Sequence, residues 1–126
     1  MTRTTVLRRS IVRVGAIAAL VVLAACGAKA SGDVRSGPGG ADAIQLVAKD
    51  NEFEQARLEV PAGEDVEIEV TNEGGTIHDF TVDSLELSTG PIEPGEVATA
   101  TFTVEQGETP FHCSIHGGME GVIVGT

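Results

Sequence analysis

The chain has 126 residues, which is room for one domain of modest size and excludes a large multidomain enzyme. Acidic side chains outnumber basic ones by 19 to 8, and the sequence has no Trp or Tyr. The charge is unevenly placed, because four arginines lie before residue 14 while the first carboxylate is Asp33. So acidic a body excludes nucleic acid as a partner and disfavours direct adsorption to anionic lipid.

The N-terminal segment has the pattern of an export signal. Its arginines precede a mostly apolar run, residues 14–25, that is too short to span a bilayer comfortably. The sequence Leu23-Ala24-Ala25-Cys26 resembles the bacterial lipobox, so we expect a lipoprotein-type signal peptide over residues 1–25 and lipidation of Cys26. The alternative is an ordinary secretory signal with a spectator cysteine. Because Arg8 and Arg9 also resemble part of a twin-arginine signal, the choice between Sec and Tat export stays open.

Residues 26–42 are rich in glycine and poor in large apolar side chains, which predicts a lipidated N-terminus followed by a flexible linker. A single domain is then expected over residues 43–126. The protein would be exported and anchored to a membrane by its N-terminal lipid, with the domain facing the periplasm or the cell exterior. With Cys26 acylated, Cys113 is the one remaining thiol, so an intrachain disulfide is impossible. A free thiol there is buried and inert, a metal ligand, or reactive.

The domain shows the two-residue hydrophobic period of half-buried β-strands. In residues 66–71 and 98–104, apolar side chains alternate with glutamates and threonines. Turn-forming residues such as Pro61-Ala62-Gly63 and Gln106-Gly107 separate the segments. We therefore predict an all-β, Greek-key β-sandwich of about seven to eight strands. The expected strands are 44–48, 57–60, 66–71, 77–82, 98–104, 109–113 and 121–124.

The most informative segment is a glycine-rich loop that carries a thiol, an imidazole and a thioether at three-residue intervals: Cys113, His116 and Met119. A fourth donor must be His78 or His112. Since neighbouring residues of a strand point to opposite faces, His112 must point away from Cys113, whereas His78 shares its face with Phe80. The set of one thiolate, two imidazoles and a weak thioether is typical of a type 1, or blue-copper, electron-transfer site.

These residues resemble the cupredoxin family of plastocyanins, amicyanins and pseudoazurins over most of residues 43–126. The resemblance rests on Val60-Pro61-Ala62-Gly63, on residues 66–72 ending in Asn72, on His78-Asp79-Phe80, and on the short C-x-x-H-x-x-M loop. It implies a cupredoxin-like sandwich with one copper ion. Cys113 would bind as thiolate, His78 and His116 through imidazole nitrogen, and Met119 axially.

Two positions depart from the family pattern. His112 stands before the cysteine, where an aromatic residue is common, and we interpret it as an exposed strand residue, with electron exit or a second metal as the alternatives. Asp79 stands where Asn is common. Strand alternation points Asp79 away from the metal, yet the corresponding family side chain ties the first-ligand strand to the cysteine loop, so Asp79 could accept a backbone N–H near Ser114. The alternative is a solvated surface acid.

The expected function is one-electron transfer by cycling between Cu(I) and Cu(II), and we do not expect an enzyme. A Cys–His protease lacks a candidate cleft, and a thioredoxin needs a second thiol. The partners would be donor and acceptor redox proteins with basic docking patches, and the carrier itself a monomer. The alternatives are a copper-binding or copper-delivery lipoprotein, and a module that serves only adhesion or assembly.

Overall fold

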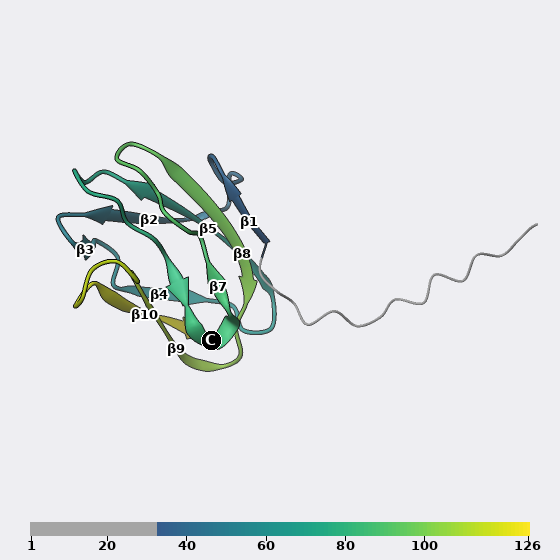
Figure 1. The fold of residues 1–126 in the computed structure, drawn as a ribbon. Helices are drawn as coiled ribbons and strands as arrows, with labels where there is room; N and C mark the ends of the chain where they lie inside the picture. The colour runs from purple at the N-terminus through teal and green to yellow at the C-terminus, as the bar shows by residue number, and fades with distance from the viewer. Residues whose placement is uncertain (1–32) are drawn as a thin grey trace, which may run out of the picture.

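The computed structural model describes residues 33–126, so the predicted signal peptide and Cys26 lie outside the described residues. The described part is built from ten β-strands and one three-residue 3-10 turn, arranged as two five-stranded sheets. Figure 1 shows the two sheets packed face to face. Among residues 33–126 we find no helix of the length and hydrophobicity needed to cross a membrane.

The first sheet carries the longest strands and has the order β1-β8-β5-β2-β3. At its centre β5 and β8 pair antiparallel, and β2 joins β5 in parallel. In β5 and β8 buried side chains alternate with more exposed polar ones, as the two-residue period predicts, except that Thr99 in β8 is also buried. The strand bounds are β1 (Asp33–Ser36), β8 (Val97–Thr103), β5 (Asp65–Asn72), β2 (Ile44–Lys49) and β3 (Glu52–Phe53).

The second sheet has the order β4-β10-β9-β6-β7 and supplies both strands that flank the cysteine loop. Its β10 pairs parallel with β4 and antiparallel with β9. The strand bounds are β4 (Arg57–Val60), β10 (Glu120–Gly125), β9 (Gly107–His112), β6 (Thr81–Val82) and β7 (Leu87–Ser88), and the turn η1 (Asp83–Leu85) joins the last two.

The core between the sheets contains all four phenylalanines, each at most 5 % exposed. Phe111 lies at the centre of this cluster, with ring centroids 5.1 Å from Phe53 and 5.2 Å from Phe80. Phe80 in turn stacks on Phe102 at 6.2 Å. Aromatic burial of this kind dominates the stability of so small a core. It also fixes the backbone at Phe111, directly before His112, and at Phe80, directly after Asp79.

The predicted all-β sandwich is confirmed, with differences in detail. Three short strands, β1, β3 and β7, were not expected, and the strand predicted over residues 77–82 is regular only at Thr81–Val82. His78 instead makes an isolated bridge to Ile92. Strand alternation therefore does not extend through residues 78–80, and all three of these side chains are buried.

The described residues 33–42 also differ from the predicted linker. The strand β1 adds to the edge of β8, and the following glycines are fastened to β5. The Gly39 N–H donates to Glu69 Oε2 over 2.6 Å, and the Gly40 N–H donates to Glu67 Oε1 over 2.7 Å. Backbone pairing and carboxylate acceptors thus order a segment whose composition alone favours flexibility.

Candidate metal centre

The candidate centre lies at one end of the sandwich, where the chain leaves regular strand geometry. His78 is held there by two backbone hydrogen bonds to Ile92, with the His78 N–H donating over 3.1 Å and the Ile92 N–H over 2.7 Å. Cys113 follows the last residue of β9, and Met119 precedes the first residue of β10. Two loops therefore bring residues 35 positions apart to one place.

His78 is fully buried, and its two ring nitrogens have different surroundings. Nε2 lies 3.4 Å from the hydroxyl of Thr76, whereas Nδ1 is buried without any hydrogen-bond partner. Burial and the neighbouring His116 lower the pKa of His78 below its ordinary value of 6.5, while Asp79 acts in the opposite direction. The imidazole is therefore neutral near pH 7. A neutral ring that donates through Nε2 leaves an acceptor lone pair on Nδ1, as a metal ligand requires.

The turn before His78 is organised by Asn72, which is also fully buried. Its amide donates to the carbonyls of Thr76 and Ile92, each over 2.8 Å, and its Oδ1 accepts the Gly74 N–H over 2.9 Å. A side chain at position 74 would crowd the site, because its Cβ would lie 3.1 Å from His78 Nε2. Sequence reasoning did not assign a positioning role to Asn72, Gly74 or Thr76, although an Asn at a strand end before Gly-Gly signals such a turn.

The cysteine loop closes on itself. The Cys113 N–H donates to the Met119 carbonyl over 2.8 Å, and the Met119 N–H lies 3.4 Å from the His116 carbonyl oxygen. Gly118 adopts a φ of 82°, which glycine tolerates without strain, and this lets the loop return to β10. Cys113 is a free, buried thiol, and the Met119 side chain is 1 % exposed.

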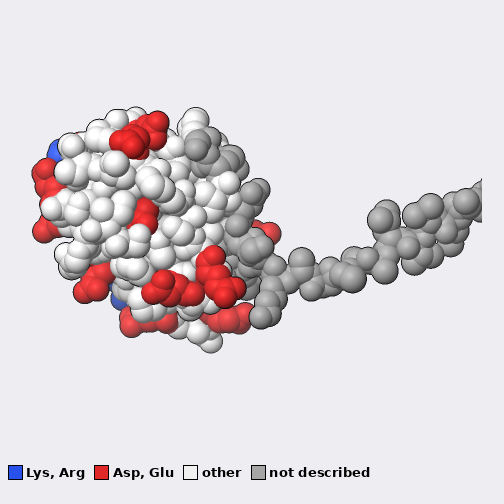
Figure 2. Space-filling view, in the orientation of Figure 1, with Lys and Arg blue, Asp and Glu red and all other residues white. Residues whose placement is uncertain are grey.

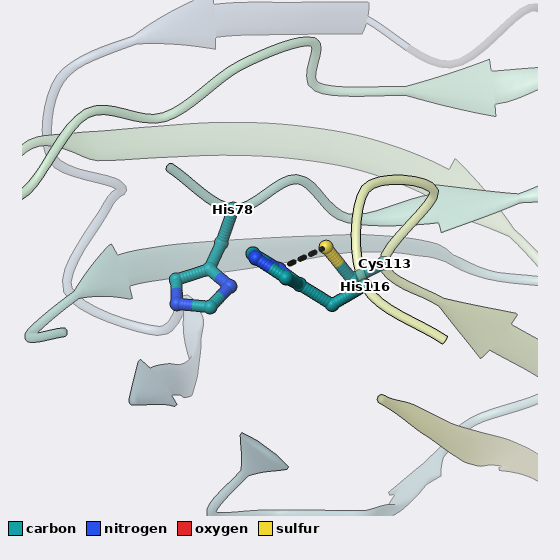
Figure 3. A group of neighbouring side chains, drawn as sticks. All are labelled: His78, Cys113 and His116. Carbon is teal, nitrogen blue, oxygen red and sulfur yellow. Dashed lines mark hydrogen bonds between the residues drawn. The ribbon is translucent and has the colours of Figure 1, made fainter. Parts of the chain in front are cut away.

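The predicted donors His78, Cys113 and His116 converge. Figure 3 shows the ring of His116 between the thiol and the ring of His78. The Cys113 Sγ lies 3.7 Å from His116 Nδ1, the two imidazole centroids are 4.8 Å apart, and one ligand atom of each residue lies within 4.8 Å of the others. Within residues 33–126 this is the one group of three or more Cys, His or carboxylate side chains close enough to hold a metal. One cysteine sulfur and two imidazole nitrogens suit copper or another soft transition metal.

Comparison with known proteins agrees with this geometry. The sequence matches the family described as "Cupredoxin-like domain" over residues 16–124. The chain belongs to the cupredoxin-like family. No curated protein sequence matches it.

Solved structures of cupredoxins have the same fold. A reduced amicyanin variant gives a TM-score of 0.64 at 20% identity, covering 76% of this chain and 99% of the amicyanin chain. A second amicyanin variant, in its reduced Cu(I) form at pH 4, gives the same values. Sodium-dithionite-reduced auracyanin from the photosynthetic bacterium Roseiflexus castenholzii gives 0.59 at 19% identity, covering 70% of this chain and 99% of that chain.

The two unusual positions of this cupredoxin have different surroundings. His112 lies outside the donor group, with its side chain 36% exposed and Nδ1 3.8 Å from Asp83 Oδ2. Asp79 is not a solvated surface acid, since it is 4% exposed and accepts the Ser114 N–H over 2.6 Å. The outward orientation expected from strand alternation is wrong, because His78 and Asp79 precede the regular strand β6.

Proposed function

We propose that this cupredoxin binds one copper ion and carries one electron at a time between larger redox proteins. The observation that carries the proposal is the convergence of Cys113, His78 and His116 around a buried imidazole Nδ1 that has no other partner. An unpartnered buried polar atom is costly, and coordination of a metal would satisfy it. Proteins of this fold are typically electron carriers, so we do not propose an enzymatic activity.

In this proposal the Cys113 thiolate, the imidazoles of His78 and His116 and, more weakly, the Met119 thioether would hold the copper ion. When bound at such a site, copper supplies reversible one-electron chemistry between its Cu(I) and Cu(II) states. The chain's contribution is to keep the donors in one geometry. The Thr76 hydroxyl and the Asn72 turn hold His78, and the Cys113–Met119 backbone bond holds the loop.

The proposed electron port is the half-exposed imidazole of His116. The side chains of Ile77 and Ile115 are the exposed large apolar ones among residues 33–126, and each directly precedes a histidine of the donor group. Gly117 and Gly118 beside His116 are also exposed and carry no side chain. An apolar rim of small and branched residues permits close approach of a partner without desolvating charge.

The proposed partners are donor and acceptor proteins with basic docking patches. Figure 2 shows carboxylates distributed over the visible face, with few basic side chains among them. A surface of this sign accelerates encounter with a positively charged patch, and salt weakens the effect. We further propose that an acylated Cys26 tethers the domain, as a monomer, to a membrane, with the domain facing the periplasm or the cell exterior.

Copper loading tests the proposed function. One equivalent of Cu(II) added to the purified protein should give an intense visible thiolate-to-copper absorption band that saturates at a 1:1 ratio. Absence of the band with the protein folded would contradict the proposal. A copper-delivery protein would use the same ligands but surrender Cu(I) readily, so rapid loss of Cu(I) to a competing chelator would favour delivery over electron transfer.

A further inference from the structure

The segment that precedes β2 crosses the outer face of the first sheet. β1 lies beside β8, whereas β2 lies on the far side of β5, so residues 37–43 pass over the two central strands to connect them. Figure 1 shows β1 at this edge, next to β8. The Gly37 N–H donates to the Val97 carbonyl over 2.8 Å, and the Gly37 carbonyl accepts the Thr99 hydroxyl over 2.6 Å. Residues 33–43 are called the strap below.

The strap is bound to the sheet by three kinds of contact. Thr99 lies on the outer face of β8, opposite Glu69 of β5, and is nevertheless fully buried with its hydroxyl bonded to the strap. The amides of Gly39 and Gly40 donate to carboxylates of β5, and Val34 packs against the core. Backbone pairing, polar contacts and apolar contacts together therefore fix where the chain joins the domain.

The direction of β1 sets the side from which the chain enters. β1 pairs antiparallel with β8, from Asp33 opposite Thr101 to Ser36 opposite Ala98, so it runs toward the first residue of β8. That end of β8 is the donor end of the sandwich, since β8 pairs antiparallel with β5, which ends at Asn72. The chain therefore reaches β1 from the side of the opposite end, where β8 connects to β9.

The length of chain between Cys26 and the strap limits how the domain can turn on a membrane. Asp33 follows Cys26 by seven residues, which span at most about 25 Å when fully extended. The donor end lies beyond the first residue of β8, a further four residues or about 13 Å from the partner of Asp33. With the strap docked, the donor end could reach the bilayer only if most of the seven residues ran back along the domain. With the strap detached, eighteen residues would separate Cys26 from Ile44 and span up to about 60 Å, so any face could reach it.

We propose that the docked strap orients this cupredoxin on its membrane, with the anchor leaving near the end opposite the donor histidines and the His116 port facing away from the bilayer. The orientation rests on the lipidation of Cys26 and the electron port of the proposed function, whereas the docking of the strap stands on the contacts described above. The partners that this orientation fits are redox proteins whose basic docking patches stand in the aqueous space rather than at the bilayer surface.

A single introduced Trp can report the orientation, because the chain has no Trp of its own. Glu93→Trp places the indole in the exposed turn before β8, at the donor end, and Gln106→Trp places it in the exposed connection between β8 and β9, at the opposite end. Each full chain is purified metal-free with its acyl group and bound to phosphatidylcholine vesicles that contain a dansyl-labelled lipid. The measurement is resonance energy transfer from the indole to the dansyl groups.

Two substitutions together should detach the strap. Val34→Asp puts a charge where an apolar side chain packs on the core, and Gly39→Ala puts a Cβ 2.6 Å from its nearest neighbour. Gly40→Ala is the matched control, because its Cβ would meet no atom closer than 3.5 Å. If the double variant does not fold, Thr99→Val replaces it, since this change removes the hydroxyl that bonds to the strap.

Hydrogen exchange of the Gly37 amide shows whether the strap is docked. This N–H should be protected in the unmodified protein and in Gly40→Ala, and should exchange at least about tenfold faster in the detached variant. An unprotected Gly37 amide in the unmodified protein would overturn the docking of the strap and the orientation with it.

With the strap docked, energy transfer from the Gln106→Trp chain should be at least about twofold higher than from the Glu93→Trp chain, because a domain of this size is roughly 30 Å across. The difference should persist with Gly40→Ala and disappear in the detached variant. Equal transfer from the two docked chains, or a difference that survives detachment, would overturn the orientation. If the acylated chain binds the vesicles no better than Cys26→Ser, the proposed lipid anchor fails and the orientation with it, while Gly37 exchange still decides the docking and copper loading still decides electron transfer.

Discussion

At the scale of single residues, polar groups in the core are concentrated at the candidate centre. Among the described residues four polar side chains are buried, and three of them, Asn72, His78 and Asp79, belong to the centre or its support. Asn72 and Asp79 are satisfied by hydrogen bonds, but His78 Nδ1 is not. Because a small core is destabilised by unsatisfied polar atoms, this exception supports the proposal that His78 binds the metal through Nδ1.

Substitution of the donors should remove the metal without unfolding the sandwich. Cys113→Ser should abolish the visible copper band because a hydroxyl is a poor copper ligand, and it should lower the free energy of unfolding of the metal-free protein by no more than about 1–3 kcal/mol. His78→Ala should also lose the band. Absorption and thermal unfolding measure both effects. His112→Ala serves as the control and should keep the band, since His112 lies outside the donor group.

Burial of His78 should make the metal-free protein less stable in mild acid. The pKa of His78 is lowered in the folded state, so on acidification the unfolded chain takes up the proton first, near its ordinary pKa of 6.5. The free energy of unfolding should therefore decline as the pH falls from about 6.5 to the folded-state pKa of His78. Above about pH 6.5 this group should have no effect on stability. Denaturant unfolding of the wild type and His78→Asn measures the effect. A wild-type pH dependence between 7 and 5 that the variant retains in full would contradict it.

At the scale of elements, the sequence predicts the strands that have a regular hydrophobic alternation, but it does not predict segments whose conformation depends on tertiary contacts. The central pair β5–β8 follows from its regular two-residue period, and the loop donors follow from their spacing and chemistry. Residues 78–80 break the period because each makes a different tertiary contact. His78 bonds to the Ile92 backbone, Asp79 accepts from Ser114, and Phe80 packs in the core. The strand β1 depends on a free edge of β8, which no local pattern reveals.

The segment that follows β1 provides a test of this tertiary ordering. A Cβ at Gly39 would lie 2.6 Å from Ala43 Cβ and 2.9 Å from Glu67 Oε1, whereas the nearest atom to a Cβ at Gly40 is 3.5 Å away. Gly39→Ala should therefore destabilise the protein by about 1–3 kcal/mol, and Gly40→Ala should have a much smaller effect. Chemical denaturation compares the two. Equal effects would mean that residues 37–43 are not packed on β5 in solution.

At the scale of the whole molecule, the acidic surface and the proposed lipid anchor have separate roles. The carboxylates suit encounter with basic partners but oppose adsorption to anionic lipid, so attachment to a membrane would depend on the acyl chains. The sandwich places its candidate centre at one end, where the exposed Ile77 and Ile115 lie beside the donor histidines. Attachment to the membrane and electron exchange with partners would then use different parts of the protein.

Removal of the proposed lipidation site should release the protein from membranes. In Cys26→Ser the thiol that would carry the acyl chains is absent, so the protein should move from the membrane fraction to the soluble fraction. Fractionation followed by immunodetection measures the change, with Cys113→Ser as the control that keeps the anchor. Retention of Cys26→Ser in membranes would point to an uncleaved signal anchor instead.

The most direct test of electron transfer is spectroelectrochemical cycling of the protein loaded with one equivalent of copper. We predict a single one-electron transition in which the visible band disappears on reduction and returns fully on reoxidation. The ratio of copper to protein should stay constant over repeated cycles, because buried His78 and the closed Cys113 loop hold the donors in place. A band that fails to return, or copper that leaves the protein on reduction, would contradict the assignment as an electron carrier.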